Sequence, residues 1–213
     1  MEKKVILFDL DGTLTDSGEG ITNCVKLALD HFDIPVHSMA DLRVFVGPPL
    51  RDSFVRFGVP EDRIEEAIAV YRSRYTTVGK FENTPYPGIR EMLETLKAQG
   101  HRLFVATSKP ENMSVEILKK FDLFQYFEEV CGATLDTSRD SKAAVIAYLL
   151  DKIGASENAV MIGDTSFDVI GAAQHGIPTI GVAWGYGNVE DMKSSGAAAI
   201  AESVEELLFL LTR

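Results

Sequence analysis

The chain has 213 residues, of which 46% are hydrophobic and 25% are charged, and its formal net charge is −11. These proportions are ordinary for a soluble globular protein, and the length suits one large domain or one domain with a smaller insertion. The negative charge disfavours nucleic-acid polymers and anionic membranes as partners. A small anionic substrate is still allowed, because a bound cation can invert the local field.

The two cysteines, Cys24 and Cys131, each lie in an apolar stretch. Two cysteines do not make a disulfide scaffold, and reduced, buried thiols favour a cytoplasmic protein. Only four apolar residues follow Met-Glu-Lys-Lys, too few for a signal-peptide core, and no apolar run reaches membrane-spanning length. We expect a cytoplasmic protein with no membrane partner. The oligomeric state stays open, with a monomer as the expectation, because the apolar stripes leave no face that argues for a dimer.

The first predicted strand, residues 5–8, leads straight into two carboxylates, Asp9 and Asp11, and Gly12 permits a sharp turn after them. Two acids at the end of a buried strand are costly unless a positive charge lies between them. A metal ion, a lysine, or both could supply that charge.

Residues 14–85 have helical periodicity and no convincing strand. Apolar side chains recur every three or four positions over 17–32 and 61–78, and a short helix is predicted over 50–57. The sequence Thr-Pro-Tyr-Pro-Gly at 84–88 then indicates a boundary. We therefore predict a separate, all-helical domain over 14–85.

From residue 86 onward, short apolar strands alternate with helices. Strands are predicted at 103–106, 127–131, 160–162, 179–182 and 199–201, and helices at 89–99, 111–121, 141–153, 165–175 and 203–211. Such alternation predicts a parallel sheet covered by helices on both faces. The expected fold class is α/β, with a doubly wound, Rossmann-like core of residues 1–13 and 86–213 and the helical domain inserted after the first strand.

Polar residues collect where four of these strands end, which is where ligands bind in such sheets. A single acid after a strand is most often a turn former or a helix cap. The coincidence of these residues at successive strand ends favours a joint site. The residues are Asp9, Asp11 and Thr13 after the first strand, Thr107 and Ser108 after the second, Lys142 beyond the third, and Asp164 and Asp168 after the fourth.

Together these motifs resemble those of the haloacid-dehalogenase superfamily of phosphotransferases, over the whole chain. Asp9-Leu-Asp11-Gly-Thr13-Leu looks like its first motif, Thr107 its second, Lys142 its third, and Gly163-Asp164-Thr-Ser-Phe-Asp168 its fourth. The helical insertion resembles the C1 cap, which implies a role in substrate specificity. Because dehalogenases of the superfamily lack the second aspartate, the resemblance favours a phosphatase or phosphomutase. The loops at 47–51 and 132–136 are similar to those of phosphoglycolate-phosphatase-like enzymes, which include members described as 5′-nucleotidases.

The resemblance implies hydrolysis of a small phosphorylated metabolite through an aspartyl phosphate on Asp9. It also implies Mg²⁺ held by Asp9, the Asp11 carbonyl, Asp164 and Asp168, with Asp11 as the general acid and base. Thr107 and Lys142 would stabilise the phosphoryl oxygens, with Thr13 and the Ser108 amide as further phosphate-binding groups. The family usually has Asn at the position of Ser108, so the role of this side chain stays open.

Arg51, between two predicted helices of the insertion, is a candidate for an anion contact that sets specificity, and an exposed surface arginine is an equal alternative. Other functions also stay open. These are a 5′-nucleotidase, a sugar phosphomutase similar to β-phosphoglucomutase, and a receiver-type phospho-acceptor module. Against the receiver, such modules have no large helical insertion after the first strand.

Overall fold

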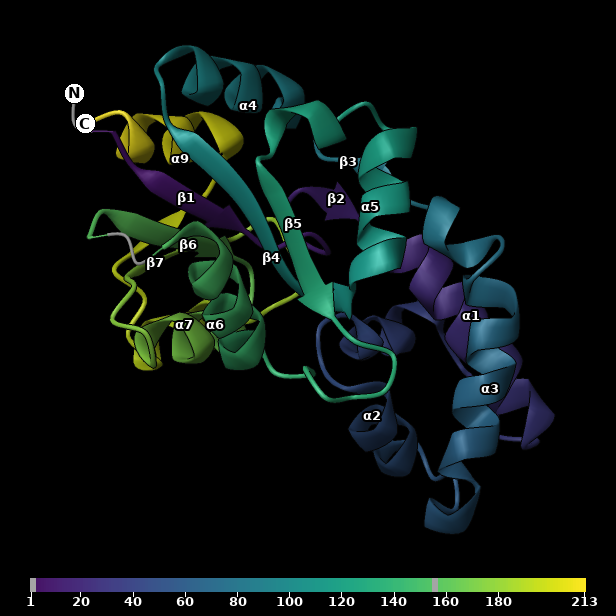
Figure 1. Ribbon diagram of the computed structural model, residues 1–213. Coiled ribbons are helices and arrows are strands. Elements are labelled where there is room, and N and C mark those ends of the chain that lie inside the picture. The colour runs from purple at the N-terminus through teal and green to yellow at the C-terminus, as the bar shows by residue number, and fades with distance from the viewer. Residues whose placement is uncertain (1–2, 155–156) are drawn as a thin grey trace. The chain divides into compact units, whose positions relative to one another are not determined.

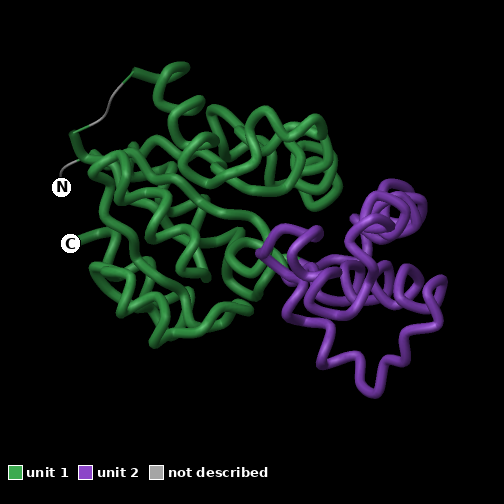
Figure 2. Tube along the Cα trace, turned by 90° about the horizontal axis from the view of Figure 1, so that it is seen from below, with its two compact units in different colours: residues 1–15, 85–213 green, residues 16–84 purple. Residues whose placement is uncertain are grey.

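The computed structural model of the protein describes residues 3–154 and 157–213. The chain forms two compact units, one of residues 1–15 and 85–213 (unit 1) and one of residues 16–84 (unit 2), as coloured in Figure 2. Unit 2 is thus inserted into the sequence of unit 1. Its role as a substrate-specificity cap stays a prediction.

Unit 1 is built on a six-stranded sheet in the order β5-β4-β1-β6-β7-β8, in which all neighbouring strands are parallel. The first strand therefore lies inside the sheet, although the next strand of the sheet begins only at Arg102, after the whole of unit 2. The strands are β1 (Val5–Phe8), β4 (Arg102–Pro110), β5 (Glu129–Ala133), β6 (Ala159–Gly163), β7 (Thr179–Val182) and β8 (Ala199–Ala201). The predicted α/β doubly wound fold is confirmed.

Helices cover both faces of this sheet (Figure 1). Ile6 and Phe8 of β1 share one apolar cluster with α4, α5 and α9, and Val5 and Leu7 share another with α6 and α7. Successive side chains of a strand point to opposite faces, so a strand covered on both sides is apolar throughout. The helices are α4 (Ile89–Ala98), α5 (Glu111–Lys120), α6 (Lys142–Ile153), α7 (Ser166–Ala173), α8 (Val189–Ser194) and α9 (Val204–Leu211), with the 3₁₀ turn η4 (Phe124–Tyr126).

In unit 1 the structure differs from the predicted elements at the end of β4, which carries site residues, and at α8. Strand β4 does not end at residue 106 but continues to Pro110, with a shift in its register against β5 between Thr107 and Pro110. Such an irregularity re-aims side chains at the end of a strand. Helix α8 was not predicted; it is short, and Asn188 caps it by accepting from the backbone N–H groups of Glu190 and Asp191.

Unit 2 is mostly helical, as predicted. Helix α1 and the 3₁₀ turn η3 approach closely, because Gly20 has no side chain: a Cβ there would lie 1.9 Å from the carbonyl oxygen of Gly79. The two-residue strands β2 (Thr15–Asp16) and β3 (Thr84–Pro85) pair with each other and were missed because they are too short to show a period. The helical elements are α1 (Gly18–His31), η1 (Met39–Phe45), α2 (Leu50–Arg56), η2 (Glu61–Arg63), α3 (Ile64–Tyr75) and η3 (Gly79–Phe81).

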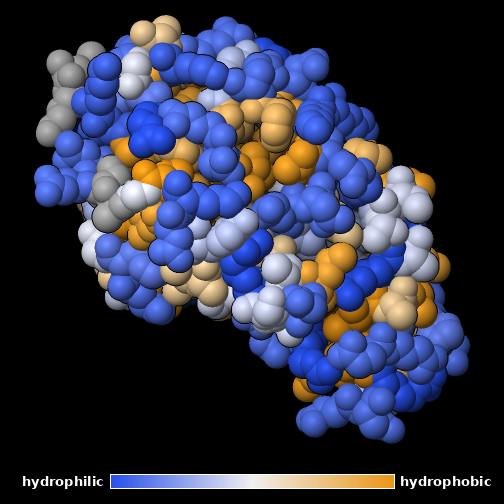
Figure 3. Space-filling view, in the orientation of Figure 1, coloured by the Kyte–Doolittle hydropathy of each residue, from blue (hydrophilic) through white to orange (hydrophobic). Residues whose placement is uncertain are grey.

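The surface is mainly polar on the face drawn in Figure 3, where hydrophobic residues form smaller areas between the hydrophilic ones. Among the residues that the structure describes, no helix has the length and apolar content needed to cross a membrane. Both cysteines are free and buried.

His101, just before β4, makes the stability of unit 1 depend on pH. Its Nδ1 accepts from the backbone N–H of Lys4 (3.1 Å), and burial, together with the charge of Lys4, lowers its pKa below 6.5. The unfolded chain therefore binds this proton more readily than the folded chain. The resulting stabilisation is complete above pH 6.5 and is lost as the pH falls through the lowered pKa.

We predict that His101→Asn removes this dependence, because Asn keeps an acceptor for Lys4 but does not titrate. Urea unfolding of both proteins should give a difference in unfolding free energy that is constant above pH 7 and changes in favour of the variant between about pH 6.5 and pH 5. The exposed His37→Asn variant is the control and should follow the wild-type profile. A constant difference between wild type and His101→Asn over the whole range would contradict the prediction.

Candidate active site

Three central strands place the candidate residues side by side. Strand β1 lies between β4 and β6, with Phe8 opposite Val105 and Ile162, so the chain leaves all three strands at one edge of the sheet. Asp9 follows β1, and its backbone N–H donates to the Ile162 carbonyl (2.9 Å). Asp164 follows β6 directly. Residues far apart in the sequence are thus neighbours because the strands are parallel and in register.

Lys142, the first residue of α6, joins two of the acids. Its Nζ lies 2.8 Å from Asp9 Oδ1 and 2.8 Å from Asp168 Oδ1, and it donates to the Ala106 carbonyl at 3.0 Å. Three acceptors match the three N–H donors of an ammonium group. Burial by itself would lower the pKa of Lys142, but Asp168 and Asp9 outweigh burial and raise it. The lysine is therefore a buried, charged counter-ion and not a solvated first-turn side chain.

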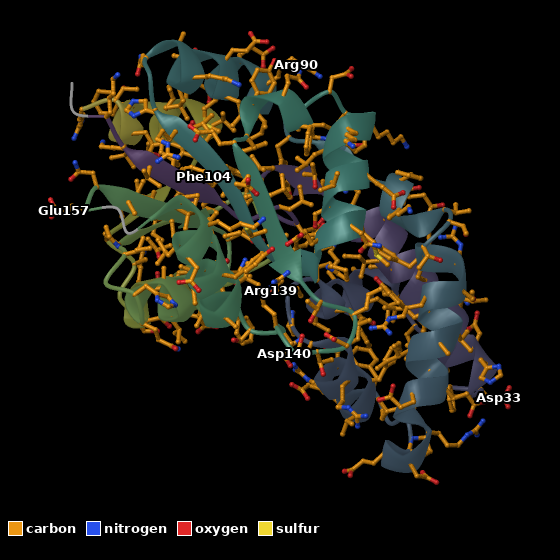
Figure 4. The ribbon with its side chains drawn as sticks, in the orientation of Figure 1. Asp33, Arg90, Phe104, Arg139, Asp140 and Glu157 are labelled. Carbon is orange, nitrogen blue, oxygen red and sulfur yellow. The ribbon has the colours of Figure 1, made fainter. Side chains whose placement is uncertain are left out.

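The start of α6 is fixed by the loop that precedes it. Arg139 and Asp140 lie on this loop between β5 and α6 (Figure 4). The Arg139 guanidinium lies over the ring of Tyr148 (3.7 Å to the centroid) and pairs with Glu111 Oε2 (3.0 Å). Ser141 caps the helix by accepting from the Ala144 N–H. These contacts anchor the backbone from which Lys142 reaches the acids.

Asp168 has two functions at once. Its Oδ2 accepts from the backbone N–H (3.1 Å) and the hydroxyl (2.8 Å) of Thr165, which completes a capping box at the start of α7. Its Oδ1 meets Lys142. The side chain is fully buried, and Gly163 makes room for it, since a Cβ there would lie 2.2 Å from Asp168 Cγ. Asp168 can therefore be a helix cap and a residue of the site at the same time.

Asp164 is a second buried acid of the site whose pKa is raised. Burial, reinforced by the charges of Asp168 and Asp9, raises its pKa to about 8. Its Oδ1 accepts from the Thr13 hydroxyl (3.3 Å) and its Oδ2 from the backbone N–H of Tyr186 (2.8 Å). Gly12 has the left-handed conformation (φ +81°) that its predicted sharp turn requires, and it passes so close to Asp164 that a Cβ would lie 2.2 Å from Oδ2.

These acids fit a divalent cation. Asp9, Asp164 and Asp168 each offer one carboxylate oxygen, and the three oxygens lie within 4.8 Å of one another. Burial raises the pKa of Asp9, against the opposing charge of Lys142. One lysine cannot neutralise three buried carboxylates, and burial, with the charges of Asp168 and Asp9, raises the pKa of Asp164. Oxygen ligands in this number suit a hard cation such as Mg²⁺.

Lys109 is a further residue of the site, next to the predicted Thr107 and Ser108. Its Nζ lies 2.5 Å from Asp11 Oδ2, and its side chain is almost fully buried. Its backbone N–H donates to the Thr107 hydroxyl (3.2 Å), within the irregular end of β4. The sequence held one signal for this contact: Lys109 follows the second predicted strand of the sheet, and two acids follow the first. The register shift that directs Lys109 toward Asp11 is not visible in the sequence.

The other predicted residues are placed as follows. Thr13 and Thr107 are buried in unit 1, and Ser108 is half-buried on β4. Arg51 belongs to unit 2, where its exposed guanidinium pairs with Glu65 of α3. This surface ion pair is what the alternative interpretation of Arg51 expects, and the roles of Ser108 and Arg51 stay predictions.

Known proteins identify the family. Residues 6–182 match the haloacid dehalogenase-like hydrolases, a span that includes the candidate residues of unit 1. The chain belongs to this family. The membership confirms the predicted resemblance and the prediction of an enzyme, in a family whose relatives include phosphatases.

Three relatives of this haloacid dehalogenase-like hydrolase have different names. The chain is 43% identical over 191 residues to a 5′-nucleotidase of Pseudomonas aeruginosa (89% of this chain, 86% of the relative). It is 42% identical over 207 residues to the tyrosine-protein kinase PtkA of Mycobacterium tuberculosis (96% and 71%). It is 32% identical over 209 residues to a phosphoglycolate phosphatase of Caulobacter vibrioides (93% and 86%).

A solved structure extends the likeness to the whole fold. A predicted phosphatase from Clostridium acetobutylicum superposes with a TM-score of 0.94 at 44% identity, over 100% of this chain and 99% of the other. The likeness therefore extends over the residues of both units.

We predict that Lys142→Met lowers the unfolding free energy by about 3–5 kcal/mol, because Asp9 and Asp168 are left buried without their counter-ion. Urea denaturation in the presence of EDTA measures this loss. The matched control is Lys152→Met, in the same helix, whose partly exposed pair with Glu129 should contribute at most about 1 kcal/mol. Equal losses in the two variants would show that the Lys142 contacts are not a buried ionic centre.

Proposed function

We propose that this protein is a Mg²⁺-dependent phosphatase that hydrolyses a small phosphomonoester through an aspartyl phosphate on Asp9. The observation that carries the proposal is the cluster of three buried carboxylates joined by Lys142 at the strand ends. A site with this much uncompensated negative charge needs a cation before it can accept a phosphate. The family membership supports the same class of reaction.

In the first step, an Asp9 oxygen attacks phosphorus and the bond between phosphorus and the ester oxygen breaks, so that the alcohol leaves. Lys142 lies 2.8 Å from Asp9 and supplies positive charge against the carboxylate and the phosphoryl oxygens. The Thr107 hydroxyl also hydrogen-bonds Asp9 and is available to a phosphoryl oxygen. Thr13 and the Ser108 amide are further phosphate contacts in this proposal.

Asp11 is the general acid and base of the proposed reaction. It protonates the leaving alkoxide in the first step and takes a proton from the water that hydrolyses the aspartyl phosphate in the second. Its contact with Lys109 fixes the orientation of the carboxyl group. This contact has to open, or pass to the leaving oxygen, when the proton moves.

Mg²⁺ would be held by Asp9, Asp164, Asp168 and the backbone carbonyl of Asp11. When bound, it would neutralise the negative charge that otherwise repels the phosphate from Asp9. Asp168 remains fixed by Lys142 and by its cap of α7, so its position does not depend on the cation.

Phosphoglycolate is the first candidate substrate, and unit 2 with Arg51 is the proposed specificity element. A nucleoside 5′-monophosphate is the second, favoured by the 43% identity to a 5′-nucleotidase. A sugar phosphomutase and, from the likeness to PtkA, a protein kinase are the remaining alternatives. A screen of phosphoglycolate, nucleoside monophosphates, hexose phosphates and ATP with a tyrosine peptide distinguishes them.

The buried, free thiols support the cytoplasmic location that we propose.

We predict that Asp9→Asn abolishes phosphate release from p-nitrophenyl phosphate while the protein stays folded, since Asn has the same shape but is not a nucleophile. Initial rates and circular dichroism measure the two properties. Asp151→Asn, an exposed position on α6, is the matched control and should retain wild-type activity. Substantial turnover by pure Asp9→Asn would remove this residue from the nucleophile's role.

We also predict that dialysis against EDTA stops turnover and that added MgCl₂ restores it. Ca²⁺ at the same concentration should restore less, because it prefers more ligands at longer distances than Mg²⁺ does. Phosphate release measured across both titrations tests this. Full activity in EDTA would refute the metal assignment and leave the family membership untouched.

A further inference from the structure

The loop after β7, residues 184–187, lies directly against Asp164. It donates a backbone hydrogen bond to this carboxylate, and its two glycines leave no side chain in the way. The backbone N–H of Tyr186 donates to Asp164 Oδ2 (2.8 Å). The indole N–H of Trp184 donates to the Thr13 carbonyl (3.1 Å), and the Thr13 hydroxyl donates to Asp164 Oδ1 (3.3 Å). Both oxygens of this buried carboxylate are therefore oriented by donors, one from this loop and one from the turn after β1.

Glycine is required at positions 185 and 187 because Asp164 lies so close to them, and not because of their backbone conformation. A Cβ on Gly185 would lie 2.3 Å from Asp164 Cβ, 2.4 Å from its Oδ2 and 2.5 Å from the Gly12 carbonyl oxygen. A Cβ on Gly187 would lie 1.9 Å from the Asp164 carbonyl oxygen. Neither glycine has a left-handed φ, so alanine is conformationally acceptable at both positions, and the contact with Asp164 is what opposes it.

Trp184 fixes the loop on its other side. Its ring meets the ring of Tyr86 at 6.4 Å between centroids, with an interplanar angle of 64°, an edge-to-face geometry. With the indole N–H bound to Thr13, the loop is attached to the turn that contains Asp9 and Asp11. The loop thus connects the segments that carry Asp9 and Asp164.

From these contacts we infer that the 184–187 loop positions Asp164 as a cation ligand, and that Trp184, Gly185, Tyr186 and Gly187 are positioning residues of the metal site. Groups that orient a ligand from behind hold the carboxylate in the rotamer that presents its remaining lone pairs to the cation. Without the loop, the carboxylate could rotate away from Asp9 and Asp168. This inference rests on the proposed Mg²⁺ site.

The chain provides its own probe, because Trp184 is the single tryptophan of the sequence. Tryptophan fluorescence of EDTA-treated protein, titrated with MgCl₂, should report binding at Asp164. The rise of the unfolding temperature with Mg²⁺ gives a second measure that does not need fluorescence or activity. Both measurements use the full chain.

Gly185→Ala should weaken Mg²⁺ binding about 10- to 100-fold, the range found when groups that orient a metal ligand are altered. Gly176→Ala is the matched control. Gly176 has φ +68°, and a Cβ there would meet no atom of the described residues within 4 Å. The control should therefore lower the unfolding temperature through backbone strain and leave the Mg²⁺ affinity at the wild-type value. Wild-type Mg²⁺ affinity in folded Gly185→Ala would overturn the inference.

If Gly185→Ala does not fold, Trp184→Phe decides the question. It keeps an aromatic ring against Tyr86 and removes only the N–H donor to Thr13, and calorimetric titration with MgCl₂ replaces fluorescence. We expect weaker binding, and unchanged affinity would overturn the positioning role. Failure of the wild type to bind Mg²⁺ would instead refute the metal site itself, and with it this role of the loop.

Discussion

The structure depends on one ionic centre, in which the Lys142 ammonium lies between the carboxylates of Asp9 and Asp168 at 2.8 Å from each. Removing such charges from water costs more than one contact returns, so a buried centre persists only where several groups satisfy it together. Lys142 uses its third donor on the Ala106 carbonyl. Asp164 is a third carboxyl group beside this centre, and burial, with the charges of Asp168 and Asp9, raises its pKa to about 8.

The parallel sheet brings this centre together. Strand β1 enters between β4 and β6, although unit 2 separates it from them in the sequence, and the three strands end at the same edge. Capping then fixes each side chain: Thr165 holds Asp168 at the start of α7, and Ser141 fixes the start of α6. Residues that look like ordinary caps in the sequence are caps in the structure as well. Capping and the site use different oxygens of the same carboxylate.

The fold was largely predictable, because long amphipathic helices and fully apolar strands have strong periods. The α/β core, the order of its elements and the edge strand at 199–201 agree with the structure. The errors lie in short or irregular elements. Among them, η1, β2, β3 and α8 are too brief to show a clear period, and β4 continues past its predicted end because Pro110 still pairs with β5 after a register shift. That shift depends on the partner strand and has no signature in local sequence.

For the site, the sequence alone determined which groups are available: carboxylates, hydroxyls and a lysine after apolar strands, in an order that resembles one family. Only the tertiary structure decided which of these groups are in contact with one another. It paired Lys142 with two acids, Lys109 with Asp11, and the glycines at 185 and 187 with Asp164. The physical reason is that strand periodicity is a property of neighbouring residues. A contact between residues 142 and 9, or 186 and 164, exists only after the sheet has set their distance.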